Sequence, residues 1–124
     1  MEVWIFGNPD LPEDALPITL LPRLRKRFPK HYFVLKDPLD EWEMPSRLVM
    51  IDTVKGLKSV RVFSSLDEFE ATPRVSMHDY DLNTQLRFLD KLGKLPEFQI
   101  VGVPDHLSPD QALEQVAGEL EKIA

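Results

Sequence analysis

The run Leu48–Ile51, within the stretch RLVMID, limits the possible folds of this chain more than any other feature. All four of its residues are apolar, and the alternation of polar and apolar residues that marks a half-exposed strand is missing. A short run of this kind is typical of a strand buried on both faces, in the middle of a parallel sheet. The sequence therefore predicts an α/β protein with helices covering both faces of such a strand.

Further strands and helices alternate along the chain. Short β-rich segments predict strands at Glu2–Phe6, His31–Leu35, Val60–Phe63 and Phe98–Val103, with the third at an edge. Helical spacing is found at residues 14–28 and 80–92, a single helical turn at 64–70, and a last helix from Ser108. This order predicts a three-layer α/β/α sandwich around a mainly parallel, twisted sheet of about five strands. The 124 residues suit one domain over the range 1–124.

Two proline-containing segments give sharper expectations about helix ends. Pro22 lies inside the first helical segment, where a proline removes a backbone hydrogen bond, so that helix should begin late or kink. Ser108 precedes Pro109, and Gln111 follows at the spacing of a capping box, so a helix should begin there. Gly93 should end the helix before it.

Composition excludes several kinds of protein. The net charge of −6 argues against nonspecific binding to nucleic acid or to an anionic membrane surface. The absence of cysteine excludes disulfides, thiol nucleophiles and thiolate metal sites. No apolar run approaches the ~20 residues that span a bilayer, and the beginning MEVWIF lacks the basic start of a signal peptide. We therefore expect a cytoplasmic protein with neither a nucleic-acid nor a membrane partner.

Acidic side chains and one histidine follow the predicted strands. Asp10, Glu13 and Asp14 come after the first strand, Asp52 ends the apolar run, and His78 precedes the helix over residues 80–92. In open α/β sheets, ligands bind beyond the carboxyl ends of the strands, where these side chains could meet. Two carboxylates and an imidazole suit a borderline divalent ion such as nickel or zinc.

Each of these residues also has a simpler interpretation. Asp14 could cap the helix that follows it. Asp52 could be a turn-forming residue, and His78 could be an ordinary surface or capping histidine. His31 and His106 have no comparable surroundings in the sequence, and we interpret both as surface residues.

Four segments, taken in order, carry a resemblance to a known family. The first is Ile5-Phe6-Gly7-Asn8 followed by Glu13-Asp14, and the second is Met50-Ile51-Asp52-Thr53. The third is Ser76-Met77-His78 ahead of a helix, and the fourth is a strand that ends in Gly102-Val103-Pro104. Together they resemble the hydrogenase maturation proteases, and the resemblance covers nearly the whole chain.

The resemblance implies a function and a site. Members of this family are endopeptidases that remove the C-terminal extension of the nickel-iron hydrogenase large-subunit precursor, which would be the partner of this chain. It implies that Asp14, Asp52 and His78 are the metal ligands and the catalytic residues. Nickel would be recognised in the substrate or bound at the site, with zinc or cadmium as a surrogate. A monomer is expected. The sequence contains no cysteine and no GxSxG motif, which fits peptide hydrolysis without a covalent intermediate.

Two departures from the family pattern leave other functions open. Ala15-Leu16-Pro17 stands where the family has G-x-G, and Lys36-Asp37-Pro38 replaces an Asp-Gly-Gly loop. Glycines permit close backbone approach or a positive φ, and proline permits neither. The alternatives are a diverged, non-catalytic metal-binding or scaffold protein in hydrogenase assembly, and a Rossmann-like domain whose acids are helix caps.

Overall fold

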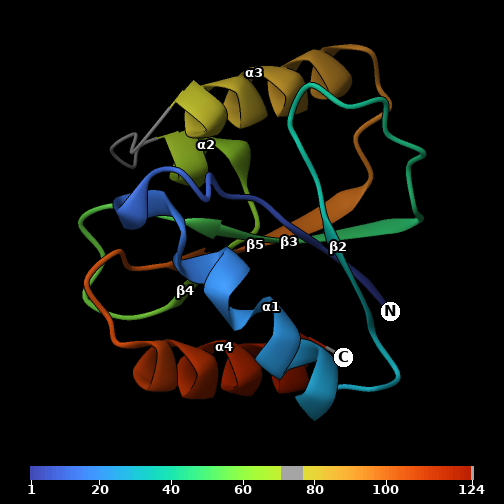
Figure 1. Ribbon diagram of the computed structural model, residues 1–124. Coiled ribbons are helices and arrows are strands. Elements are labelled where there is room, and N and C mark those ends of the chain that lie inside the picture. Colours follow the sequence, from blue (N-terminus) through green and yellow to red (C-terminus); the bar gives the residue numbers. More distant parts are fainter. Residues whose placement is uncertain (71–76, 124) are drawn as a thin grey trace.

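The computed structural model describes residues 1–70 and 77–123, and the side chains of residues 77–81 lie outside that description. Its elements in chain order are β1 (Glu2–Ile5), the 3₁₀ helix η1 (Pro12–Asp14), α1 (Leu16–Arg27), β2 (Tyr32–Leu35), β3 (Arg47–Thr53), β4 (Arg61–Phe63), α2 (Leu66–Glu70), α3 (Met77–Lys91), β5 (Glu97–Val103) and α4 (Pro109–Ile123). The alternation of strands and helices that the sequence predicted is only partial (Figure 1): β2, β3 and β4 follow one another without an intervening helix, and so do α2 and α3 without an intervening strand among the described residues.

The strands form one five-stranded sheet in the order β2-β1-β3-β5-β4. β3 lies at its centre and pairs in parallel with both β1 and β5. β2 is parallel to β1, whereas the edge strand β4 runs antiparallel to β5. The prediction that Leu48–Ile51 belongs to a central parallel strand is therefore confirmed, as is the edge position of β4.

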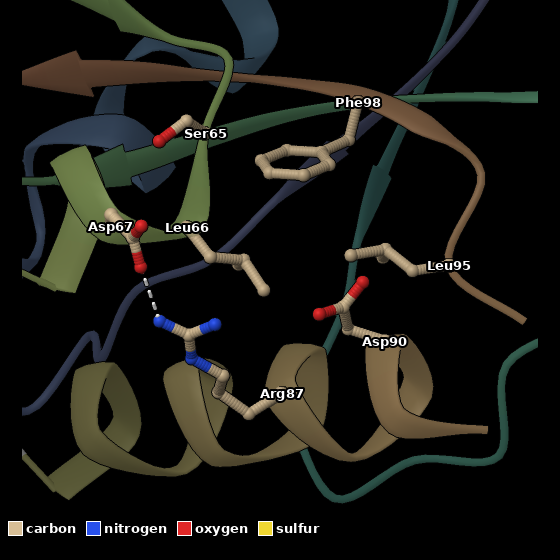
Figure 2. A pocket seen from close by; sticks show the side chains of 7 residues that line it. All are labelled: Ser65, Leu66, Asp67, Arg87, Asp90, Leu95 and Phe98. Carbon is tan, nitrogen blue, oxygen red and sulfur yellow. Dashed lines mark hydrogen bonds and ion pairs between the residues drawn. The ribbon is translucent and has the colours of Figure 1, made fainter. Parts of the chain in front are cut away.

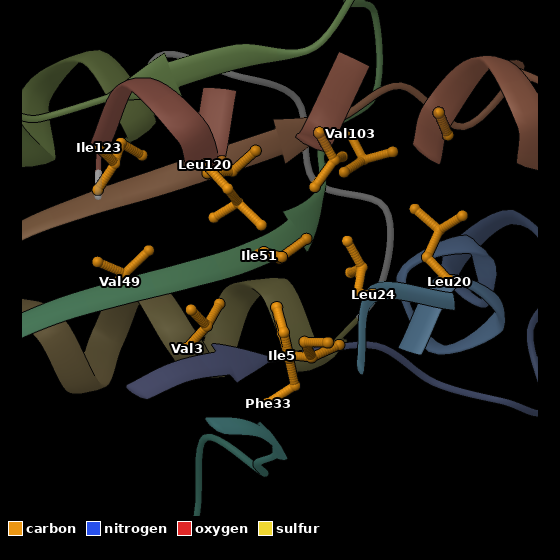
Figure 3. Close-up of a cluster of buried hydrophobic side chains, with 13 residues drawn as sticks. Val3, Ile5, Leu20, Leu24, Phe33, Val49, Ile51, Val103, Leu120 and Ile123 are labelled. Atoms are coloured by element: carbon orange, nitrogen blue, oxygen red, sulfur yellow. The ribbon is translucent and has the colours of Figure 1, made fainter. Parts of the chain in front are cut away.

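Helices cover both faces of this sheet, which confirms the three-layer prediction (Figure 1). Alternate side chains of β3 point to opposite faces, as they do in any strand. Val49 and Ile51 pack with α1 and α4, and Figure 3 shows this cluster around Leu24 and Leu120. Leu48 and Met50 pack with residues of α2 and α3 on the other face.

Two helix boundaries differ from the prediction. α1 begins at Leu16, later than residue 14, and continues through Pro22. Pro22 is exposed, so the carbonyl that loses its amide partner lies on the side of the helix that faces solvent. α3 begins at Met77, earlier than the predicted residue 80.

The predicted end of α3 and the predicted start of α4 are confirmed. Gly93 follows α3 with φ = 69°, a left-handed conformation that glycine adopts without strain. At the start of α4, the Gln111 amide donates to the Ser108 hydroxyl and the Ser108 amide donates to the Gln111 side chain, both at 3.2 Å. This is the expected capping box. Across the described residues, no helix is both long enough and apolar enough to cross a membrane.

Candidate metal and active site

The loop after β1 folds back on itself and thereby positions Asp14. The Leu11 amide donates to the Asn8 carbonyl, and the Asp14 amide donates to the Leu11 carbonyl at 2.9 Å. The Asn8 amide closes the loop by donating to the Asp14 carbonyl at 3.1 Å. The Asn8 side chain accepts from the Asp10 amide at 3.0 Å, an Asx-type turn that stiffens the loop from within.

Gly7 is required in this loop for reasons of space. A β-carbon at Gly7 would stand 2.7 Å from the Asp14 carbonyl oxygen and 3.2 Å from the Ile18 side chain. Its φ is not positive, so the conformation itself would tolerate a side chain. The Gly7-Asn8 pair that the sequence resemblance rests on is therefore what brings η1 against the end of β1.

Asp52 lies within β3, which continues to Thr53. Its partner across the ladder is Gly102 of β5, and the preceding carbonyl, that of Ile51, accepts from the Phe6 amide at 2.9 Å. Asp52 is therefore next to the point where the chain leaves β1 for Gly7. Because the strand runs past it, the alternative interpretation of Asp52 as a turn-former is wrong.

Both carboxylates are buried. Asp14 is 0% and Asp52 1% exposed, and among the described side chains they are the only charged groups in the buried class. The N-cap of α1 is Ala15, and no side chain caps that helix end, so Asp14 does not act as the cap that the sequence left open. Placing a carboxylate in the interior costs free energy unless a partner or a cation offsets the loss of water. Two buried acids at the carboxyl end of a parallel sheet fit a divalent cation, whose preferred donors include carboxylate oxygens.

His78 is the second residue of α3, but its side chain lies outside the described part of the structure. Figure 1 shows η1, the tip of β3 and the first turn of α3 toward the same side of the molecule. Among the side chains that are described, no three acids or histidines form a group that could hold a metal ion. The assignment of His78 as a third ligand therefore stays a prediction.

Acids near the site take other roles. Glu13 and Asp10 are exposed. Asp37, in the turn after β2, accepts from the Leu39 amide at 2.9 Å, and its own amide donates to Asp40 at 3.0 Å. This turn and the first loop enclose a hollow of about 290 Å³, lined by Gly7, Pro9, Leu35, Lys36, Asp37 and Asp40.

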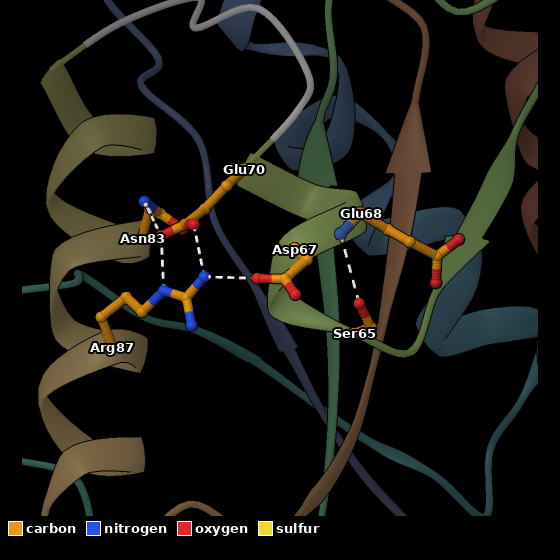
Figure 4. Close-up of polar contacts among 6 residues, drawn as sticks. All are labelled: Ser65, Asp67, Glu68, Glu70, Asn83 and Arg87. Carbon is orange, nitrogen blue, oxygen red and sulfur yellow. Dashed lines mark hydrogen bonds and ion pairs between the residues drawn. The ribbon is translucent and has the colours of Figure 1, made fainter.

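An ionic network between α2 and α3 was not predicted from the sequence. Arg87 donates to Glu70 at 2.6 Å and to Asp67 at 2.7 Å, and Asn83 donates to Glu70 at 3.0 Å (Figure 4). The hydrogen bonds to Glu70, and then those to Asp67, raise the pKa of Arg87 above its usual range. Beside the network is a hollow of about 240 Å³ whose walls include Leu66, Phe98 and Asp90 (Figure 2). The network ties α2 to the helix that carries His78.

His31 is half-buried at the surface, and its ring has aromatic partners that the sequence did not indicate. Its ring stacks on Phe28 with centroids 5.5 Å apart and meets Phe33 edge-on. Burial lowers the pKa of His31 from its usual value of 6.5, and the nearby positive N-terminus lowers it further. His106 is exposed, as predicted.

Solved structures with the same arrangement of elements are known. The hydrogenase maturating endopeptidase HybD from E. coli matches with a TM-score of 0.65 and 22% sequence identity over 100% of this chain and 94% of its own. An endopeptidase from Escherichia coli, solved in solution, matches with a TM-score of 0.69 and 19% identity over the same shares. This chain has the fold of the HybD endopeptidase.

A third structure with this fold is an uncharacterized protein from Wolinella succinogenes, with a TM-score of 0.56 and 14% identity over 98% of this chain and 92% of that one. The sequence matches no protein-family model and no curated protein. The likeness to HybD thus extends over the whole chain at the level of the fold. The two buried carboxylates of this chain, Asp14 and Asp52, lie at the carboxyl end of its sheet.

Proposed function

We propose that this chain is a nickel-dependent endopeptidase that removes the C-terminal extension of a nickel-iron hydrogenase large-subunit precursor. The observation that carries the proposal is the pair of buried carboxylates, Asp14 and Asp52, at the carboxyl end of the sheet in a chain with the HybD fold. Asp14, Asp52 and His78 are the proposed ligands. Nickel enters as part of the substrate, and zinc or cadmium could stand in for it.

The chain's own residues have distinct tasks in this proposal. Asp14 and Asp52 hold the metal-loaded end of the precursor at the carboxyl end of the sheet. Their burial keeps bulk water from competing for the same carboxylate oxygens. His78 completes the set with a nitrogen donor. With these residues as its ligands, a divalent ion would supply Lewis-acid chemistry, which can polarise a carbonyl and lower the pKa of a water molecule toward neutrality. Gly7 and Asn8 hold Asp14 in place through the loop contacts described above.

A second function is favoured by one observation. α1 begins at Leu16 with Pro17 in its first turn, where the resembled family has its G-x-G. A proline and a helix at this position prevent the backbone flexibility that the glycines would allow. The alternative is therefore a non-catalytic protein of hydrogenase assembly that binds the metal-loaded precursor without cutting it.

Incubation with a nickel-loaded precursor, followed by mass spectrometry of the released C-terminal peptide, tests the proposal. We expect processing by the wild-type protein and none by Asp52→Asn or His78→Ala. Asp10→Asn is the matched control, because Asp10 is an exposed acid of the same loop, and it should process normally. Binding of the precursor without release of peptide would leave the assembly function in place of the peptidase.

A further inference from the structure

The outer edge of β2 and the adjoining end of α1 form a surface that the proposed function leaves unused. β2 is the first strand in the sheet order, and β1 is its one partner among the described strands. Figure 3 shows β2 at the border of the sheet, beyond β1. We define the β2 edge surface as Arg25, Lys30, His31 and the strand Tyr32–Leu35.

The direction of the backbone groups along β2 can be derived from its hydrogen bonds. The amides of Tyr32 and Lys36 both donate toward β1 at 2.9 Å. Because backbone groups alternate between the two sides of a strand, the N–H and C=O groups of Phe33 and Leu35 point away from β1. The Arg25 guanidinium agrees with this direction, since it donates to the outward Phe33 carbonyl at 3.0 Å. The outward N–H groups are a template onto which another strand can pair.

Apolar side chains are exposed along the same edge. Tyr32 is 76% and Leu35 48% exposed, and Leu39, in the turn that follows β2, is 78% exposed. These are half of the six large hydrophobic residues that stand exposed in the described structure. A chain that paired with β2 would cover Tyr32 and Leu35 with its own side chains, which adds hydrophobic burial to the backbone hydrogen bonds.

The charge around this edge is opposite to that of the protein as a whole. Residues 15–36 contain six of the fifteen lysines and arginines and none of the twenty-one acids, in a chain of net charge −6. Arg23 and Arg27 are each paired with an acid of α4 at 2.6 Å. Arg25, Lys26 and Lys30 are exposed, and no ion pair joins them to an acid among the described residues. A partner that bound here would meet the exposed ammonium groups of Lys26 and Lys30, and the Arg25 guanidinium, which already donates to the Phe33 carbonyl but has further N–H groups.

The surface is also concave where β2 begins. Two hollows of about 260 and 370 Å³ adjoin there and share Pro29 and His31. Lys30 borders the first hollow, and Arg25 and Tyr32 border the second. Acidic side chains of a bound segment could therefore lie between these cations while its backbone follows β2.

We propose that the β2 edge surface binds an extended, acidic segment of another protein, which adds to β2 as a further edge strand. Outward amides, exposed apolar side chains and unpaired cations coincide at this one edge. The inference concerns a surface separate from Asp14 and Asp52 and does not depend on the proposed function.

Backbone hydrogen exchange on the full-length protein tests the mode of binding directly. The probe is a short synthetic peptide whose glutamates precede an alternating threonine–valine run. Its binding should slow exchange at the Phe33 and Leu35 amides, which point outward. The Tyr32 amide, already bonded toward β1, should change little, so the alternation is an internal control. Protection without this alternation would overturn strand addition.

Two pairs of variants separate the contribution of charge to peptide binding from the contribution of the backbone. Lys30→Glu should weaken peptide binding by about tenfold, whereas Lys94→Glu, the same change at an exposed lysine outside this surface, should leave it unaltered. Leu35→Pro removes an outward N–H without removing a bond to β1, a position where an edge strand tolerates proline. It should weaken binding more than Leu35→Ala, which keeps the N–H, and circular dichroism should confirm the fold of every variant.

Three results would overturn the proposal. The first is no binding of the acidic peptide by the wild-type protein. The lysines would then serve to prevent other strands from pairing with β2. The second is equal binding of a peptide with prolines at alternate positions, which cannot pair as a strand. The third is equally tight binding of single-stranded oligothymidylate, since the surface would then attract any polyanion.

Discussion

At the scale of single residues, close packing requires glycine at two positions next to the candidate site. Gly7 leaves room for the Asp14 carbonyl, and Gly102, the ladder partner of Asp52, lies where a β-carbon would meet Phe63 at 2.8 Å. Both glycines are thus required by close packing, and neither has a positive φ. Each carboxylate of the candidate site has one of these glycines beside it.

We predict that Gly7→Ala displaces η1 and with it Asp14. The new methyl group cannot fit 2.7 Å from a backbone oxygen, so the loop must shift, at a cost of about 1–3 kcal/mol in the free energy of unfolding. Urea denaturation measures the loss, and nickel titration should show weakened binding. Gly118→Ala is the control, because nothing lies within 4 Å of its added carbon; it should stabilise α4 by about 0.5–1 kcal/mol. Similar effects at both glycines would contradict the steric argument.

His31 should titrate below its usual pKa of 6.5, because burial disfavours its charged form. The unfolded chain then binds more protons than the folded one between the two pKa values. The contribution of His31 to stability is therefore complete above pH 6.5 and is lost progressively as the pH falls from that value through the lower pKa of the folded chain. NMR titration measures the pKa, and denaturation at several pH values measures the stability. His31→Phe, which keeps the stacking on Phe28, should lose this part of the pH dependence; an unchanged profile would refute the assignment.

At the scale of elements, local signals and long-range contacts determine different features. The start of α4 depends on Ser108 and Gln111, which lie within one turn of each other. The attachment of α2 to α3 depends on Arg87 and Glu70, which are 17 positions apart in the chain. The first feature can be predicted from a short window of sequence, whereas the second requires knowledge of which helices are neighbours.

Ser108→Ala should lower the free energy of unfolding by about 1 kcal/mol, because the Gln111 amide at the start of α4 loses its acceptor. Thermal and urea denaturation measure the change. Ser59→Ala, at another exposed loop serine, is the matched control and should have little effect. If the two variants lost equal stability, the capping box would not be the source of the difference.

At the scale of the whole molecule, the proposed metal site would link folding to metal binding, because its two carboxylates are buried only in the folded chain. A cation that binds only the folded chain stabilises it by about 2.7 kcal/mol at a concentration one hundred times its Kd. We predict that nickel raises the melting temperature of the wild-type protein and that a chelator reverses the rise. Asp52→Asn should remove the effect and Asp10→Asn should keep it. A rise that survives Asp52→Asn would place the metal elsewhere.

Much of the fold could be predicted because its signals are local or periodic. The apolar run at Leu48–Ile51 indicated a strand buried on both faces, and the alternation of strands with helices indicated a parallel sheet between two helical layers. The same order of elements indicated that Asp14 and Asp52 lie near the carboxyl ends of two strands, and the carboxyl ends of parallel strands lie at the same end of a sheet. The structure differs in one detail, since Asp52 belongs to β3 and does not follow it. The sequence did not decide whether Asp14 is a helix cap or a metal ligand, because either role places an acid just before a helix.

The sequence by itself determined most of the helices and strands, the mainly parallel arrangement of the sheet, and the end of the sheet near which Asp14 and Asp52 lie. Only the tertiary structure decided that Asp14 and Asp52 are buried, that His31 stacks on Phe28, and that β2 borders the sheet beside exposed cations that pair with no acid in the described part of the chain. The physical reason is the range of the forces involved. Hydrophobic periodicity and capping act within a few residues, whereas burial and pairing depend on which distant segments become neighbours once the sheet has formed.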